Sequence, residues 1–105
     1  MKSPLSSRRR RKLKLLLIRR IVGESMVPTL RPGQIVLAYA SPKKVKPGSV
    51  IILEHQGLEK IKRVEKLEAG KLFVVGDNLS QSTDSRQFGW LDARQIRGRI
   101  IWPRT

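Results

Sequence analysis

Residues 23–33, GESMVPTLRPG, divide the sequence into two parts of different composition. Before them, residues 1–20 carry nine of the 23 Lys and Arg residues and none of the eight Asp and Glu residues. After them, short runs of apolar and β-branched residues alternate with Gly and Pro, a pattern typical of short strands joined by tight turns. Within the segment, a serine precedes a methionine and two prolines. Such a serine is either a turn residue or a nucleophile held by stiff flanking structure.

The part that follows the segment predicts a mainly β domain. The predicted strands cover residues 34–40, 49–54, 59–67, 72–75 and 99–102, and a helical turn is predicted at 91–96. A polar loop is expected at 76–89. Many short strands at this spacing favour a compact β-barrel or a folded sheet. We therefore expect one β domain at residues 21–105, preceded by a basic N-terminal arm at 1–20, either flexible or a short amphipathic helix.

The composition excludes several kinds of site. The chain has no cysteine, so neither a disulfide framework nor a thiolate metal site is available. Its one histidine, His55, argues against a histidine metal site and against a Ser-His-Asp triad. We expect no metal and no cofactor, and any general base to be a residue other than histidine.

The basic arm predicts affinity for an anionic partner, either a membrane surface or nucleic acid. Residues 12–22 fit a basic amphipathic helix and fit equally well a first strand or helix that packs on the core. Their apolar run is far shorter than the roughly 20 residues that span a bilayer, and it is too short for a secretory signal. We therefore expect a cytoplasmic protein without a transmembrane segment, in contact with a membrane at most peripherally.

A lysine could act as the base for a serine nucleophile. It can accept the serine proton only when it is neutral, and burial lowers a lysine pKa because it disfavours the charged form. Lys62, in the predicted strand segment KIKRV (60–64), is a candidate. Alternation places Lys62 on the same side as Val64, but spacing alone does not distinguish Lys62 from Lys60.

Three motifs together resemble the type I signal peptidases. The sequence GESMVPTLRPGQIVL (23–37) resembles the nucleophile box of that family, and KIKRV (60–64) resembles its Lys-Arg-Val box. The third, GDNLSQSTDSRQFG (76–89), resembles its Gly-Asp-Asn box, and GWLDARQIRGRIIWP (89–103) is similar to its closing segment. The motifs occur in the order found in the family, and the resemblance covers residues 21–103. It implies the β fold shared by signal peptidases and LexA.

The resemblance implies a role for each matching residue. Ser25 would be the nucleophile, Lys62 the general base, and Ser82 the hydroxyl that orients the lysine amine. A neutral hydroxyl suits that task, because a carboxylate in its place would keep the lysine protonated.

The resemblance also implies support roles for residues around this group. Asp84 and Arg86 would form an ion pair that stabilises the loop of Ser82. Asp77 and Asn78 match the Gly-Asp-Asn turn, although these residue types are also common in ordinary turns. The implied role of Met26 is to shield the site, although a methionine in such a position is more often core filling.

One position departs from the pattern. Many bacterial relatives have a serine where this chain has Gly23, and the hydroxyl of that serine helps to bind the oxyanion. We therefore expect the backbone N–H of Ser25 to be the main oxyanion donor.

The function implied is that of a Ser/Lys endopeptidase that removes an N-terminal leader from a protein substrate. In size and in its Gly-x-Ser-Met start, the chain is most similar to the small maturation proteases of nickel-type superoxide dismutase. A self-cleaving domain of the LexA type is one alternative, but such domains lack the 76–89 motif. The other alternative is a small basic nucleic-acid-binding module, favoured by residues 8–11 and by SPKK (41–44). The aromatic content argues against this module, because the chain has only five aromatic residues and they form no evident platform for stacking bases.

Overall fold

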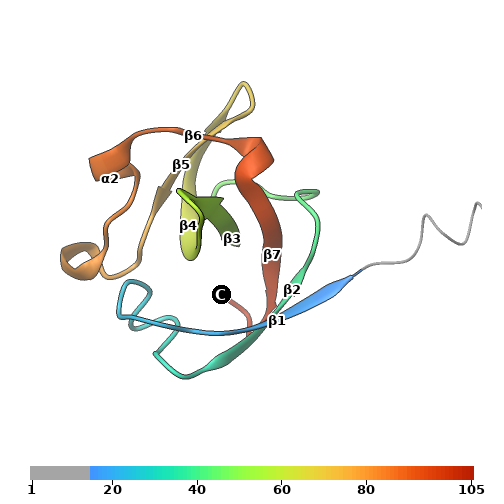
Figure 1. Ribbon diagram of the computed structural model, residues 1–105, viewed down its shortest axis with the longest axis vertical. Helices are drawn as coiled ribbons and strands as arrows, with labels where there is room; N and C mark the ends of the chain where they lie inside the picture. Colours follow the sequence, from blue (N-terminus) through green and yellow to red (C-terminus); the bar gives the residue numbers. More distant parts are fainter. Residues whose placement is uncertain (1–14) are drawn as a thin grey trace, which may run out of the picture.

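The computed structural model describes residues 15–105, which form mainly β structure (Figure 1). The strands are β1 (Leu16–Arg20), β2 (Ile35–Tyr39), β3 (Val50–His55), β4 (Leu58–Glu68), β5 (Lys71–Val75), β6 (Leu91–Asp92) and β7 (Ile96–Trp102). Three short helical turns, η1 (Leu79–Gln81), α2 (Ser85–Phe88) and η2 (Ala93–Gln95), lie between β5 and β7. The prediction of a mainly β fold is confirmed.

The seven strands form one antiparallel sheet in the order β1-β2-β7-β3-β4-β5-β6. In the described part of the chain, the terminal strands β1 and β6 are not paired with each other. Of the two predicted architectures, the folded sheet is therefore correct and the closed barrel is wrong. Two hairpins have positive φ at both turn residues, at Gln56-Gly57 and Ala69-Gly70. Such turns match the twist of the flanking strands, which explains the direct pairing of β3 with β4 and of β4 with β5.

The strand β3 is buried on both faces and separates two apolar clusters. Its alternating side chains divide between them, because successive residues of a strand point to opposite faces. Val50 and Ile52 join a cluster that also contains Ile21, Met26, Leu30, Val36, Ala38 and Ile100. Ile51 and Leu53 join the other, with Val64, Leu72, Val74, Leu91 and Ile96. The folded sheet thus encloses a core on each side of β3.

The segment before residue 21 adopts one of the alternative forms predicted for residues 12–22. Residues 16–20 form β1, which pairs with β2 in the register Leu16↔Tyr39 to Arg20↔Ile35. The described part of the predicted arm is therefore a strand of the sheet and not an amphipathic helix. Residues 1–14, which hold most of its charge, lie outside the described residues. The predicted helical turn at 91–96 corresponds to the short strand β6 followed by η2.

Candidate active site

Ser25 lies in the loop that joins β1 to β2, and this loop is closed at its base. Ile21 N donates to Gln34 O at 2.8 Å, and Gly33 N donates to Ile21 O at 2.8 Å. Met26, directly after the serine, is buried in the first apolar cluster. The half-buried serine is thus attached to a loop whose two ends and one side chain are fixed.

Lys62 lies on β4 and is buried, with 5% of its surface exposed. Its Nζ donates a hydrogen bond to Ser82 Oγ at 3.0 Å. Burial lowers the pKa of Lys62, and the positive charges of Lys60 and Arg86 act in the same direction, while the carboxylate of Asp84 opposes them. The net effect favours the neutral amine, the form that can accept a proton.

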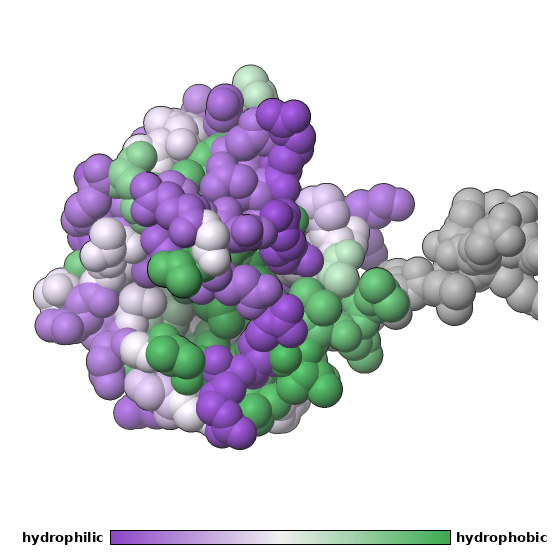
Figure 2. Space-filling model, in the orientation of Figure 1, coloured by the Kyte–Doolittle hydropathy of each residue, from purple (hydrophilic) through white to green (hydrophobic). Residues whose placement is uncertain are grey.

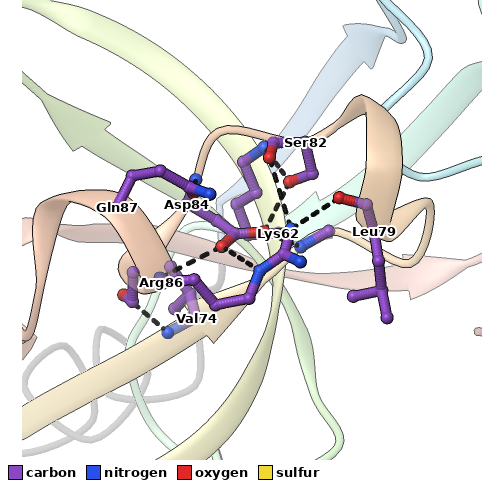
Figure 3. A network of polar contacts seen from close by, with 9 residues as sticks. Lys62, Val74, Leu79, Ser82, Asp84, Arg86 and Gln87 are labelled. Atoms are coloured by element: carbon purple, nitrogen blue, oxygen red, sulfur yellow. Dashed lines mark hydrogen bonds and ion pairs between the residues drawn. The ribbon is translucent and has the colours of Figure 1, made fainter.

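Ser82 connects Lys62 to a buried carboxylate (Figure 3). Its Oγ donates to Asp84 Oδ2 at 2.6 Å, and Asp84 is completely buried. Burial alone would raise the pKa of Asp84, but hydrogen bonds from Arg86, Ser82 and the backbone N–H of Gly76 hold it well below its usual range. Asp84 therefore stays ionised, and the Ser82 hydroxyl lies between this charge and the lysine amine.

The loop that carries Ser82 is fixed by its own helix cap. Arg86 Nε forms an ion pair with Asp84 Oδ1 at 2.9 Å, as the resemblance implied. Asp84 also accepts from Arg86 N, while Asp84 N donates to Gln87 Oε1 at 2.8 Å, which completes a capping box at α2. Ser85 Oγ accepts from Val74 N at 2.9 Å. These bonds attach the loop to β5.

Asp77 and Asn78 lie behind the nucleophile loop. Asp77 accepts two hydrogen bonds from Arg63, at 2.9 and 2.7 Å, and one from Thr29 Oγ1 at 2.5 Å. Asn78 N donates to Ser25 O at 2.8 Å, and Asn78 Nδ2 donates to Glu24 O at 3.1 Å. The two residues therefore join the loop of Ser25 to β4 and to the loop of Ser82, which is more than an ordinary turn requires.

Three residues of this network were not identified from the sequence as site residues: Thr29, Arg63 and Gly76. Each lies within a motif quoted above, but its partner is distant in the sequence. A Cβ on Gly76 would lie 2.6 Å from Ser25 O and 2.6 Å from Ser82 Cβ. Real Cβ atoms do not approach other heavy atoms so closely, so only glycine lets these two loops meet here.

A cleft of about 500 Å³ brings the candidate residues together. It is lined by Arg19, Arg20, Ile21, Val22, Gly23, Glu24, Ser25, Met26, Glu59, Lys60, Ile61, Lys62, Gln81 and Thr83. Ser25 and Lys62 share this cleft, and Ser82 and Asp84 lie behind the lysine. Ser25 Oγ makes no hydrogen bond with Lys62 or with another described residue. This is compatible with an active site, because hydrogen bonds between catalytic groups are often long when no substrate is bound. Among residues 15–105, no group of three His, Asp or Glu residues is placed to hold a metal ion.

Two strand edges border the cleft. In the described chain, β1 pairs only with β2, and the 58–62 part of β4 pairs only with β3, since pairing with β5 begins at Arg63. Arg19 of β1 and Glu59 of β4 form an ion pair across the cleft, with Nε and Oε1 2.7 Å apart. The backbone N–H of Ser25 also has no acceptor among the residues described.

Comparison with known proteins identifies similar sequences. Residues 52–104 match the family described as "Signal peptidase, peptidase S26". The chain is 32% identical over 109 residues to the mitochondrial ATP-independent inner membrane protease subunit 1b of Arabidopsis thaliana, over 76% of this chain and 64% of the relative. It is 32% identical over 110 residues to the mitochondrial inner membrane protease subunit 1 of Mus musculus, over 77% and 66%. The chain thus spans slightly less than two thirds of these relatives.

These relatives correct two predictions. Their names place them at the mitochondrial inner membrane, so the prediction of a cytoplasmic location is wrong. The predicted similarity to maturation proteases of nickel-type superoxide dismutase finds no support among them. In the part of the chain that the structure describes, no helix is long and apolar enough to cross a bilayer.

Proposed function

Because the chain belongs to the signal peptidase family, peptidase S26, we propose that it is a serine endopeptidase in which Ser25 is the nucleophile and Lys62 the general base. One observation carries the assignment: a buried lysine, with its pKa lowered by burial, lies in the same cleft as a serine in a fixed loop. A buried lysine has little structural benefit, because an apolar side chain would fill the space at lower cost.

In the proposed reaction, the neutral Lys62 amine takes the proton of Ser25 Oγ as this oxygen attacks the scissile carbonyl carbon. The tetrahedral intermediate then breaks its C–N bond, and the Lys62 ammonium gives the proton to the leaving amine. Water, deprotonated by the same amine, releases the acyl group from Ser25. The backbone N–H of Ser25, which has no acceptor in the described part of the chain, is the proposed donor to the oxyanion.

The hydrogen bonds around Ser82 suit this role for Lys62. Since Ser82 gives its own proton to Asp84, its oxygen accepts an N–H of the lysine amine. A neutral amine that donates one N–H to Ser82 keeps its lone pair for the proton of Ser25. Ser82 is therefore proposed as a positioning residue.

We infer that the substrate is a protein segment bound in extended form. The edges of β1 and β4 that pair with no other strand among residues 15–105 border the cleft, and such edges bind extended peptides by strand addition. The apolar side chains of Ile21, Val22 and Ile61 line the same space. By analogy with the named location of the relatives, the protein would act at the mitochondrial inner membrane or an equivalent membrane and remove an N-terminal leader.

The test is to incubate the protein with a library of peptides derived from preproteins and to identify products by mass spectrometry. Ser25→Ala and Lys62→Ala should each abolish cleavage while circular dichroism shows a retained fold. Ser80→Ala and Lys66→Ala change exposed residues of the same types outside the cleft and should cleave normally. Full cleavage by either cleft variant would overturn the proposed mechanism.

A further inference from the structure

An ion pair crosses the cleft and has no part in the proposed catalysis. Arg19 of β1 donates twice to Glu59 of β4, from Nε to Oε1 at 2.7 Å and from Nη2 to Oε2 at 3.0 Å. In this two-bond geometry an arginine recognises a carboxylate most specifically. Glu59 precedes Lys62 by three residues on the same strand. Because a strand rises by about 3.3 Å per residue, the pair lies roughly 10 Å along the groove from the lysine.

The two strands that border the cleft run in the same direction, because four antiparallel pairings separate them in the sheet: β1–β2, β2–β7, β7–β3 and β3–β4. Ile21 lies in the first apolar cluster and Leu17 packs against it, so Arg19, between them, points to their side. On β4, Ile61 packs against the same cluster, and alternation places Glu59 on its side. The cleft lining therefore has an apolar level, Ile21 and Ile61, and a charged level, Arg19 and Glu59, two residues apart along both chain segments.

An extended peptide in the cleft would meet the two levels with alternate side chains. Its side chains repeat on one face every two residues, which is also the spacing of the levels. Ser25 and Lys62 follow the apolar level in their chain segments, so this level is the nearer one to the proposed catalytic pair. A substrate side chain at the charged level is therefore two residues farther from the scissile bond than one at the apolar level.

The charged level is accessible to a substrate. The side chains of Arg19 and Glu59 are 36% and 42% exposed. Figure 2 shows hydrophilic residues directly beside the hydrophobic ones that gather around β1. Ion pairs as exposed as this one contribute little to stability, so a carboxylate brought by the substrate can replace one partner at small cost.

The charges around the pair favour an acidic substrate side chain over a basic one. Hydrogen bonds with Glu59 raise the pKa of Arg19, and no other acidic group among residues 15–105 contributes to that rise. The pKa of Glu59 is lowered by its hydrogen bonds with Arg19 and also by the charges of Arg19 and Arg97. If a substrate carboxylate displaces Glu59, Glu59 therefore keeps a cation nearby. A substrate ammonium group bound to Glu59 would instead leave Arg19 without a carboxylate.

We propose that the charged level is a specificity subsite that selects a Glu or Asp side chain of the substrate. The substrate carboxylate takes the place of Glu59 on the guanidinium group of Arg19. The preferred substrate segment then has an apolar side chain near the scissile bond and an acidic one two residues farther along. This inference rests on the proposed peptidase function, whose substrate it specifies.

The first experiment scans a peptide that the parent protein cleaves. Each position within about six residues of the scissile bond is changed in turn to Glu and to Gln, and the ratio of the two kcat/KM values is measured. Glu should be favoured about fivefold, as expected for one half-exposed ion pair, at one position on one side of the bond. A scan with Leu and Ser should find an apolar preference two residues closer to the bond. A preference for Glu at every position would show only attraction to a basic protein and would overturn the proposal.

Two variants at the charged level should move this ratio in opposite directions. Arg19→Gln removes the guanidinium group and should bring the Glu-to-Gln ratio at that position to about one. Glu59→Gln removes the competing carboxylate and should raise the ratio above that of the parent, which general damage to the cleft would not do. Arg94→Gln breaks an exposed ion pair with Asp92 outside the cleft and should keep the ratio of the parent. An unchanged ratio in Arg19→Gln would overturn the proposal.

A binding experiment separates failure of the subsite from failure of the proposed catalysis. Fluorescence anisotropy measures the Kd of Ser25→Ala for labelled peptides that contain Glu-x-Leu or Leu-x-Glu and for their Gln counterparts, whether or not the parent cleaves them. Tighter binding of one Glu peptide, lost when Arg19→Gln is added, would support the subsite even if the catalytic assignment is wrong. Equal Kd values for the Glu and Gln peptides, or no binding of either, would overturn the proposal.

Discussion

Lys62 and Asp84 are separated by a single hydroxyl group. Lys62 Nζ donates to Ser82 Oγ at 3.0 Å, and the same oxygen donates to Asp84 Oδ2 at 2.6 Å. A direct contact between amine and carboxylate would favour a charged lysine. Asp84 instead fixes the Ser82 hydroxyl, and this hydroxyl orients the Lys62 amine. The amine and the carboxylate stay apart, which is compatible with a neutral amine in a buried site.

This relationship predicts the effect of Ser82→Ala. Without the hydroxyl, Lys62 keeps its burial but loses its fixed direction, so kcat should fall about 10²-fold or more while KM changes little. Thermal unfolding should show a retained fold. Ser80→Ala, an exposed serine of the same loop, serves as the control. A rise in KM at unchanged kcat would show that Ser82 contacts substrate and does not position the lysine.

The pH profile of cleavage should follow the protonation of Lys62. In the proposed mechanism the neutral amine is the active form, so kcat/KM should rise with pH through a pKa that burial has lowered below the ordinary 10.5. The charge of Lys60 contributes to this lowering, so Lys60→Gln should move the midpoint to higher pH. Asp84 acts in the opposite direction, so Asp84→Asn should move it to lower pH. Identical midpoints in all three proteins would exclude Lys62 as the titrating base.

The same burial predicts that Lys62→Met stabilises the protein. A lysine whose pKa is lowered in the folded state binds its proton more readily in the unfolded chain, and this favours unfolding at every pH below the unfolded pKa, in full once the pH is below the folded pKa. Removing the amine should raise the free energy of unfolding by about 0.5–2 kcal/mol at neutral pH. The gain should shrink as the pH approaches 10.5, where the unfolded lysine also loses its proton. Chemical denaturation at a series of pH values measures the difference in the free energy of unfolding between Lys62→Met and the parent. A destabilised variant would contradict the expectation.

Gly76→Ala should separate the loop of Ser25 from the loop of Ser82. The new Cβ would lie 2.6 Å from both Ser25 O and Ser82 Cβ. Relief of this overlap should cost about 1–3 kcal/mol of stability and should displace Ser25 from Lys62, with a large loss of kcat. Gly70→Ala places a methyl group in open space at a hairpin turn with positive φ. It should lower the melting temperature without changing kcat per folded molecule.

Local sequence patterns predicted most of the strands, because Gly and Pro punctuate the apolar runs after Gly33. These patterns could not predict whether the segment that contains β1 forms a helix or a strand, since residues 12–22 fit both patterns equally well. The outcome depends on the pairing of β1 with β2 about 20 residues later in the chain. Barrel closure likewise depends on whether distant edges meet, which no local pattern specifies.

The same limit applies to the candidate site. Lys60 and Lys62 are indistinguishable by spacing, but in the structure Lys62 is buried and donates to Ser82 of the 76–89 loop. The resemblance to signal peptidases selected Lys62, and the structure supplies the physical reason for its low exposure. The partners of Asp77 could not be predicted, because Thr29 and Arg63 approach it from two other segments.

Asp77→Asn tests whether this three-segment junction holds the nucleophile loop. Loss of the charge-assisted bonds to Arg63 should cost about 1.5–3 kcal/mol and lower kcat. Hydrogen bonds from Arg63 lower the pKa of Asp77, so its stabilisation is present above its ordinary value of 3.8 and is lost as the pH falls through the lowered pKa. The variant should therefore lose less stability on acidification than the parent. Glu54→Gln, which breaks the exposed pair with Arg97, should cost under about 1 kcal/mol. Equal losses in the two variants would show that Asp77 makes only a surface ion pair.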